Sequence, residues 1–103
     1  MSEIVFRSAV ALAAAIRDRE LSSEEVVAAH LDHIDRHNDR FNAIVTLDGE
    51  GARSRAREAD AALAAGEIWG PLHGVPVTIK DTFQVAGMRT VSGFRRPPGF
   101  EPA

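Results

Sequence analysis

Residues 70–81 read GPLHGVPVTIKD, a short apolar run that ends in a lysine and an aspartate. Successive side chains of a β-strand point to opposite faces, so Val75, Val77 and Ile79 are predicted on one face and Lys80 on the other. Lys80 then lies at the C-terminal end of an apolar strand. Ligands of open α/β sheets bind beyond the carboxyl ends of the strands, so this position is a candidate site.

The rest of the chain predicts three helices and a second strand. The predicted elements are helices at about 8–20, 22–37 and 50–65 and strands at about 41–47 and 74–80. Ser22 and Glu25 have the spacing of a capping box. Asn38 and Asp39 predict the break after the second helix, and Asp48 is suited to cap the third. This order predicts an α/β layer structure with a right-handed crossover.

Apolar residues at helical spacing predict the buried side of each helix. They are Val10, Leu12, Ala13, Ile16, Val27, Leu31, Ile34, Ala52, Ala56, Ala59 and Leu63. Gly66 is suited to follow the end of the third helix. We expect these elements to belong to a single domain.

The segment after Lys80 is rich in glycine and proline, and no third strand is predicted there. A sheet of two strands is marginal, and its open edge is prone to pairing. We therefore expect residues 1–103 to be the N-terminal portion of one domain, incomplete in this chain. Its exposed apolar faces are expected to self-associate or to dock with the missing remainder.

Composition narrows the class of function. The formal net charge is −3, which argues against a nucleic-acid partner, because such binding needs a basic face. The chain has no cysteine, so thiolate chemistry and cysteine-ligated metals are excluded. The longest apolar run, 9–16, is shorter than the roughly 20 residues of a membrane helix. The N-terminus lacks the basic start of a signal peptide, so we expect a cytoplasmic protein without a membrane partner.

The position of Lys80 alone leaves its chemistry open. Burial of a lysine disfavours the charged form, and a neutral amine can take a proton from a hydroxyl nucleophile. A lysine at a strand end can equally form a Schiff base, bind phosphate or pair with an acid such as Asp81. From composition and spacing alone, the ion-paired lysine is the more common case.

Residues 70–81, with 85–90 and Ser92-Gly93, closely resemble the first conserved block of the amidase-signature family. Residues 21–27 and 42–45 are similar to its N-terminal helices and first strand, so the resemblance covers nearly the whole chain. It implies a mixed-sheet α/β/α fold, of which this chain holds only the first elements. The family includes bacterial amidases and the A subunits of glutamyl-tRNA amidotransferases.

The resemblance implies a Ser–cis-Ser–Lys triad without a cofactor or metal, in which Lys80 is the catalytic base. In the family, the lysine acts through a bridging serine on a nucleophilic serine, and both serines lie in a downstream Gly/Ser-rich segment that also helps to form the oxyanion hole. No such segment occurs here. The chain also departs from the family where residues 94–98, FRRPP, follow Gly93 in place of a small residue.

The leading prediction is therefore an amidase that hydrolyses linear small-molecule amides. An amidotransferase A subunit, which passes ammonia onward, is the alternative within the family. The sequence around 82–85 favours the general amidase. The alternative outside the family is a truncated or isolated non-catalytic domain that serves as an interaction module. Neither the amide substrate nor the oligomeric state follows from the sequence.

Three histidines on the second predicted helix form another candidate site. At 100° per residue, His30, His33 and His37 lie within about 60° of one another. Imidazole is a common zinc ligand, so a metal face is conceivable. The stripe flanks apolar residues and has no carboxylate at ligand spacing, which favours a packing or solvated role.

The remaining polar and aromatic residues have structural interpretations. His73 is some seven residues from Lys80, or about 23 Å along a strand, so a role in a turn is favoured over a second base. Asp81 is expected to bond backbone amides, and Trp69 to fill space. The arginines are interspersed with acids and predict a solvated helix face. They are Arg53, Arg55, Arg57, Arg95 and Arg96.

Overall fold

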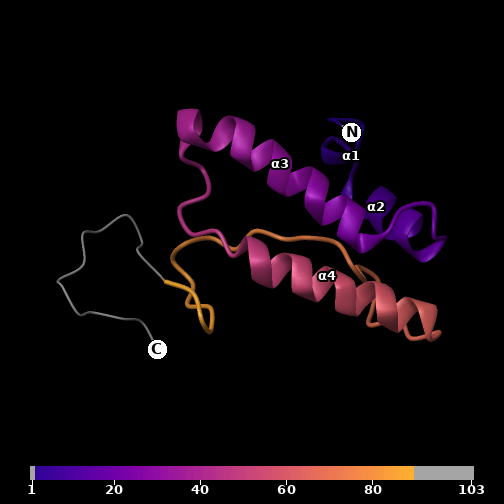
Figure 1. The fold of residues 1–103 in the computed structure, drawn as a ribbon. Helices are drawn as coiled ribbons and strands as arrows, with labels where there is room; N and C mark the ends of the chain where they lie inside the picture. Colours follow the sequence, from indigo (N-terminus) through magenta and orange to yellow (C-terminus); the bar gives the residue numbers. More distant parts are fainter. Residues whose placement is uncertain (1, 90–103) are drawn as a thin grey trace.

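The described part of the chain consists of four helices joined by loops (Figure 1). Residues 69–89 form the returning segment, which runs back along the last two helices (Figure 1). The structure is a computed structural model that describes residues 2–89. Its helices are α1 (Ser2–Val5), α2 (Ala9–Arg17), α3 (Ser23–Phe41) and α4 (Gly49–Ala64). Within the described residues, no helix is both long and apolar enough to cross a membrane.

Local capping bonds explain where the three longer helices begin. The Ser8 side chain accepts a hydrogen bond from the Ala11 N–H at 3.1 Å. The predicted capping box is confirmed, because Ser22 Oγ accepts from the Glu25 N–H at 3.0 Å and Glu25 Oε1 accepts from the Ser22 N–H at 3.2 Å. Asp48 Oδ1 likewise accepts from the Gly51 N–H at 2.9 Å. Each cap satisfies an N–H group that has no partner inside the helix.

The predicted end of α3 is wrong. The helix continues through Asn38 and Asp39 to Phe41, and Asn42 caps it in the left-handed conformation with φ 50°. The Asn38 side chain donates to the Ile44 carbonyl and accepts from the Ile44 N–H, both at 2.8 Å. Asn38 thus does not break the helix; its side chain holds the chain that folds back after it.

The predicted α/β sheet is not confirmed in the part of the chain that the structure describes. The range 41–47 begins inside α3 and continues as an irregular loop, and residues 75–80 form neither helix nor β-ladder. Some backbone groups of these two ranges have other partners: both backbone groups of Ile44 bond Asn38, and the Gly74 carbonyl accepts from Ser23 Oγ at 2.6 Å. A two-stranded ribbon would in any case be marginal.

The hydrophobic core lies where α1, α2 and α3 meet. Its cluster of buried side chains is Ile4, Leu12, Ile16 and Val26, and Leu21, Ala29, Leu63 and Val75 pack against it. Val10 is the exception among the residues predicted to be buried on α2, because 76% of it is exposed. The buried side of α2 is formed by Leu12, Ala13, Ala15 and Ile16 instead.

Asp60 of α4 forms hydrogen bonds with the start of α3. Its Oδ1 accepts from the Ser23 N–H at 2.7 Å, and its Oδ2 accepts from the Glu24 N–H at 3.0 Å. Both donors belong to the first turn of α3, whose N–H groups lack helical partners. The carboxylate also lies at the positive end of the helix dipole. Asp60 therefore joins α3 to α4 as a cap supplied from another helix.

We predict that Asp60→Asn lowers the free energy of unfolding by about 1–3 kcal/mol, because the amide nitrogen faces an N–H donor and leaves it without an acceptor. Urea unfolding followed by far-ultraviolet circular dichroism measures this loss. Asp39→Asn is the matched control, since Asp39 is exposed on α3, and a change within about 0.5 kcal/mol is expected. Equal losses in the two variants would contradict the role given to Asp60.

Candidate active site

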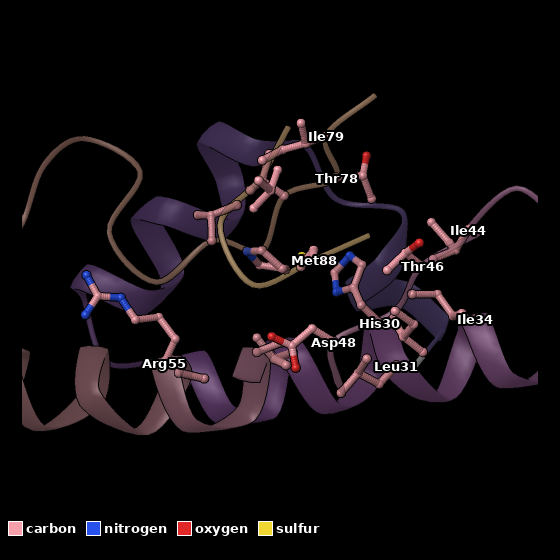
Figure 2. A pocket seen from close by; sticks show the side chains of 18 of the residues that line it. His30, Leu31, Ile34, Ile44, Thr46, Asp48, Arg55, Thr78, Ile79 and Met88 are labelled. Carbon is pink, nitrogen blue, oxygen red and sulfur yellow. The ribbon is translucent and has the colours of Figure 1, made fainter. Parts of the chain in front are cut away.

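An open groove lies between the helices α3 and α4 and the two loops that follow them. Its volume is about 1560 Å³, and it is lined by parts of α3, α4 and the segments 43–48 and 69–89. In Figure 2, His30, Leu31 and Ile34 come from α3, and Thr78 and Ile79 come from the returning segment. The groove offers room for another molecule or another part of a polypeptide.

The walls of the groove are apolar, yet they stay open to solvent. Its large apolar side chains with more than half of their surface exposed are Val45, Leu47, Leu72, Val77, Ile79 and Phe83. Val77 was predicted to lie on the strand face opposite Lys80, and 79% of it is exposed. Residues 75–80 therefore alternate in the sequence as a strand does, but the described residues leave Val77 and Ile79 of the apolar face mostly exposed.

His73 fixes the beginning of the segment that leads to Lys80. The ring is buried, its Nε2 lies 2.8 Å from the Ala59 carbonyl of α4, and its Nδ1 accepts from the Trp69 N–H at 3.0 Å. Trp69 packs against this ring with centroids 4.9 Å apart, and the Arg55 guanidinium lies over the indole, 4.1 Å from its centroid. The predicted turn role of His73 is confirmed, and Trp69 packs on its neighbours with 42% of its surface exposed.

Gly74 and Ser23 form the second attachment of this segment. Ser23 is 1% exposed, and its hydroxyl donates to the Gly74 carbonyl at 2.6 Å. Gly74 has φ +79°, a conformation that favours glycine. An added Cβ would lie 3.0 Å from Ser23 Cβ and 3.2 Å from Ile16 Cγ2. Only glycine fits both the backbone angle and this close approach.

Lys80 lies six residues beyond Gly74, at the border of the groove. Its side chain is exposed, and its carbonyl accepts from the Phe83 N–H at 3.0 Å in the turn that follows. The described residues thus do not build the enclosed cleft expected around the amine. Within the described residues, Lys80 is therefore exposed to solvent at the border of the groove.

The three histidines of α3 have different surroundings. His30 Nδ1 lies 2.8 Å from the Val26 carbonyl, and its ring borders the groove. The His33 ring packs edge-on against Phe6 with centroids 6.0 Å apart, and it lies 4.5 Å from the His37 ring. Within residues 2–89, no three histidine or acidic side chains are grouped as a metal site would require. The observed contacts are a hydrogen bond from His30 to the backbone of its own helix and ring contacts of His33 with Phe6 and His37.

The arginines of α4 lie on a solvated face, as predicted. Arg55 forms an ion pair with Glu58 at 2.7 Å, and Arg57 lies 3.8 Å from a Glu24 oxygen. All four of these side chains are more than half exposed, so such pairs contribute little to stability. The same prediction for Arg95 and Arg96 concerns residues outside the described part of the chain. The departure from the family at 94–98 also lies outside it.

The polar junction formed by Ser23, Asp60 and Gly74 was not predicted from the sequence. Asp60 and Gly74 are separated from Ser23 by 37 and 51 residues, so no local pattern marks the contact. The only signal was a second serine directly after the cap residue Ser22. That serine has no role in the local capping box, and its burial was not predicted.

Comparison with known proteins identifies a family that matches this chain. The model of the family described as Amidase matches residues 25–100. The chain is 47% identical over 102 residues to a protein from Acidothermus cellulolyticus that is named as the A subunit of a glutamyl-tRNA(Gln) amidotransferase, covering 99% of this chain and 20% of the relative. A protein of the same name from Salinispora arenicola is 43% identical over 102 residues, covering 99% and 21%.

A third relative with this name, from Aromatoleum aromaticum, is 42% identical over 89 residues, covering 86% of this chain and 18% of the relative. The chain thus spans about a fifth of the length of the curated relatives it matches.

Proposed function

Because the chain belongs to the amidase family, we propose that it forms part of an enzyme that breaks the carbon–nitrogen bond of an amide, with Lys80 as the base. The observation that carries this proposal is the place of Lys80. It is the only lysine of the chain, and it borders the apolar groove at the end of a segment attached at His73 and Gly74.

The relatives favour the amidotransferase A subunit over the general amidase that the sequence around 82–85 suggested. Three relatives from different genera carry that name at 42–47% identity. We therefore propose that the whole enzyme takes ammonia from an amide and passes it to an acceptor. The general amidase and the amidotransferase share the amide-cleaving half of this chemistry, so the role of Lys80 is the same in both.

In the proposed reaction, Lys80 Nζ accepts a proton that is relayed from a serine hydroxyl. The serine oxygen attacks the amide carbon, and the amide nitrogen leaves as ammonia after taking up that proton. Water then attacks the acyl-serine ester, which frees the acid and restores the hydroxyl. By resemblance, the nucleophilic and bridging serines come from a Gly/Ser-rich segment, and residues 1–103 contain no such segment.

We predict that the 103-residue chain alone hydrolyses no amide above the buffer rate. Loss of the nucleophile from a serine triad costs about 10⁶ in turnover in the subtilisin example. Ammonia release from benzamide and from glutamine is the measurement. Robust turnover that disappears in Lys80→Ala would contradict the prediction, because the chain would then contain a nucleophile other than the proposed one.

The proposed function itself is tested in a chimaera. This chain replaces the matching 102 residues of the Acidothermus cellulolyticus relative, to which it is 47% identical. We expect the chimaera to release ammonia from an amide, since the relative supplies the rest of the domain. A chimaera that folds, as judged by circular dichroism and size-exclusion chromatography, but releases none would overturn the proposal.

A further inference from the structure

We infer that His73 is the positioning residue for Lys80, because its neutral ring locks the start of the Lys80 segment to α4. Only the kinetic part of this inference depends on the proposed function. Two hydrogen bonds define the protonation state of the ring. A carbonyl oxygen can only accept, so Nε2, at 2.8 Å from the Ala59 carbonyl, carries the hydrogen. A backbone N–H can only donate, so Nδ1, at 3.0 Å from the Trp69 nitrogen, carries a lone pair.

A ring with one hydrogen, on Nε2, is the only state that makes both bonds. Protonation would place an N–H on Nδ1 opposite the N–H of Trp69, which removes the acceptor and sets two donors against each other. His73 is 7% exposed, so water has little access to replace the lost bond. Acid therefore releases the turn 69–73 from α4.

The lock reaches Lys80 through a short, continuous stretch. Gly74 follows His73 directly, and its carbonyl is held by the buried Ser23 hydroxyl. From there to Lys80, the part of the segment within the described residues has neither helix nor β-ladder to hold it. The direction in which Lys80 approaches the groove is therefore set at its upstream end, where His73 and Gly74 are fixed. A misplaced base loses catalysis even when substrate still binds.

Other charged and titratable groups border the same groove and must be separated from His73 in any pH experiment. They are His30 on α3, Asp48 and Arg55 at α4, and Lys80, Asp81 and Arg89 on the returning segment. Asp60 follows Ala59 on α4 and bonds the first turn of α3. Of these, His30 is the other histidine of the groove, so it provides the matched control.

The first test uses Trp69, the only tryptophan of the chain, as a reporter beside the ring. Its fluorescence is recorded from about pH 8 to about pH 5, the range in which histidine changes charge. We expect an acid transition in the unchanged chain and in His30→Asn. The transition is expected to be lost in His73→Asn, which keeps an acceptor for Trp69, and in His73→Gln, which keeps a donor for Ala59.

An identical transition in the His73 variants, or its loss in His30→Asn, would overturn the lock. If the His73 variants do not fold, the unchanged chain still gives a decision. A long-range ¹H–¹⁵N correlation spectrum distinguishes the protonated ring nitrogen from the unprotonated one. We expect hydrogen on Nε2 alone at neutral pH. Hydrogen on Nδ1, or on both nitrogens, would overturn the inference.

The kinetic test uses the chimaera. His73→Gln is expected to lower kcat for amide hydrolysis by about 10–10²-fold and to leave KM within about twofold, because it misplaces the base rather than the substrate. An unchanged kcat, with or without a rise in KM, would overturn the positioning role. If the chimaera that keeps His73 shows no activity, the proposed function is overturned. The spectroscopic results on the 103-residue chain would still decide the protonation state of His73.

Discussion

Lys80→Met in the chimaera is expected to lower the rate of ammonia release by about 10²–10⁴-fold or more, the range that a general base contributes. Methionine keeps an unbranched side chain of similar length but has no amine to accept the serine proton. Lys80 is exposed at the groove border of the 103-residue chain, so its replacement leaves no cavity in the core of this part. The loss should therefore appear in kcat without loss of folded protein.

Lys80→Arg distinguishes a catalytic base from a residue that acts only through its positive charge. Arginine keeps the charge but cannot be deprotonated, so it cannot act as a base. We expect Lys80→Arg to be as inactive as Lys80→Met. Arg53→Met is the matched control for removing one exposed cation, and its rate should stay within a few-fold of the unchanged chimaera. Activity in Lys80→Arg close to the unchanged rate would contradict the role of base and favour an electrostatic one.

Gly74→Ala in the 103-residue chain is expected to lower the free energy of unfolding by about 1.5–3.5 kcal/mol. The left-handed conformation costs an alanine about 1–2 kcal/mol. The added Cβ would also press on the Ser23 and Ile16 side chains at 3.0–3.2 Å, and moving Ser23 breaks its bond to the Gly74 carbonyl. That bond contributes a further 0.5–1.5 kcal/mol or so.

Gly66→Ala provides the control for the backbone angle. Gly66 has φ +84°, and an added Cβ there meets nothing within 4 Å. It therefore carries the conformational cost alone, about 1–2 kcal/mol. Urea unfolding of both variants measures the difference. Equal losses would show that the close approach of Gly74 to Ser23 contributes nothing, and that the segment is not held at this point.

The helix starts were predictable because their signals are local. Ser22 and Glu25 are three residues apart, and both bonds of the capping box lie within one helical turn. The end of α3 was not predictable in the same way. Asn38 is equally suited to break a helix and to bond the chain that leaves it, and its contact with Ile44 decides for the second.

The predicted sheet shows the limit of apolar alternation. Residues 75–80 alternate as a strand does, but a strand also needs a neighbour whose backbone groups are free. Asn38 takes both groups of Ile44, and Ser23 takes the carbonyl of Gly74. Alternation reports which side chains prefer burial and carries no information on such long-range bonds.

The candidate site was predictable only in part. The position of Lys80 at the end of an apolar run marked it as a candidate, but its role as a base came only from the resemblance of residues 70–81, since its spacing alone allowed several kinds of chemistry. The residues that hold its segment were not predicted together, because Ser23, Asp60 and His73 come from three separate parts of the chain. His73 was correctly assigned to a turn, but its bond to Ala59 depends on the packing of α4.

Amine rescue of the Lys80→Ala chimaera tests the central claim most directly, because a free amine can replace the missing one. Ammonia release from benzamide would be followed as trimethylamine, which accepts a proton but forms no stable amide, is added at fixed pH and ionic strength. We predict a rate that rises with the concentration of the free base in Lys80→Ala and stays constant in the unchanged chimaera. A rate in Lys80→Ala that already equals the unchanged one, or that trimethylamine alters equally in both proteins, would contradict the assignment of Lys80 as the base.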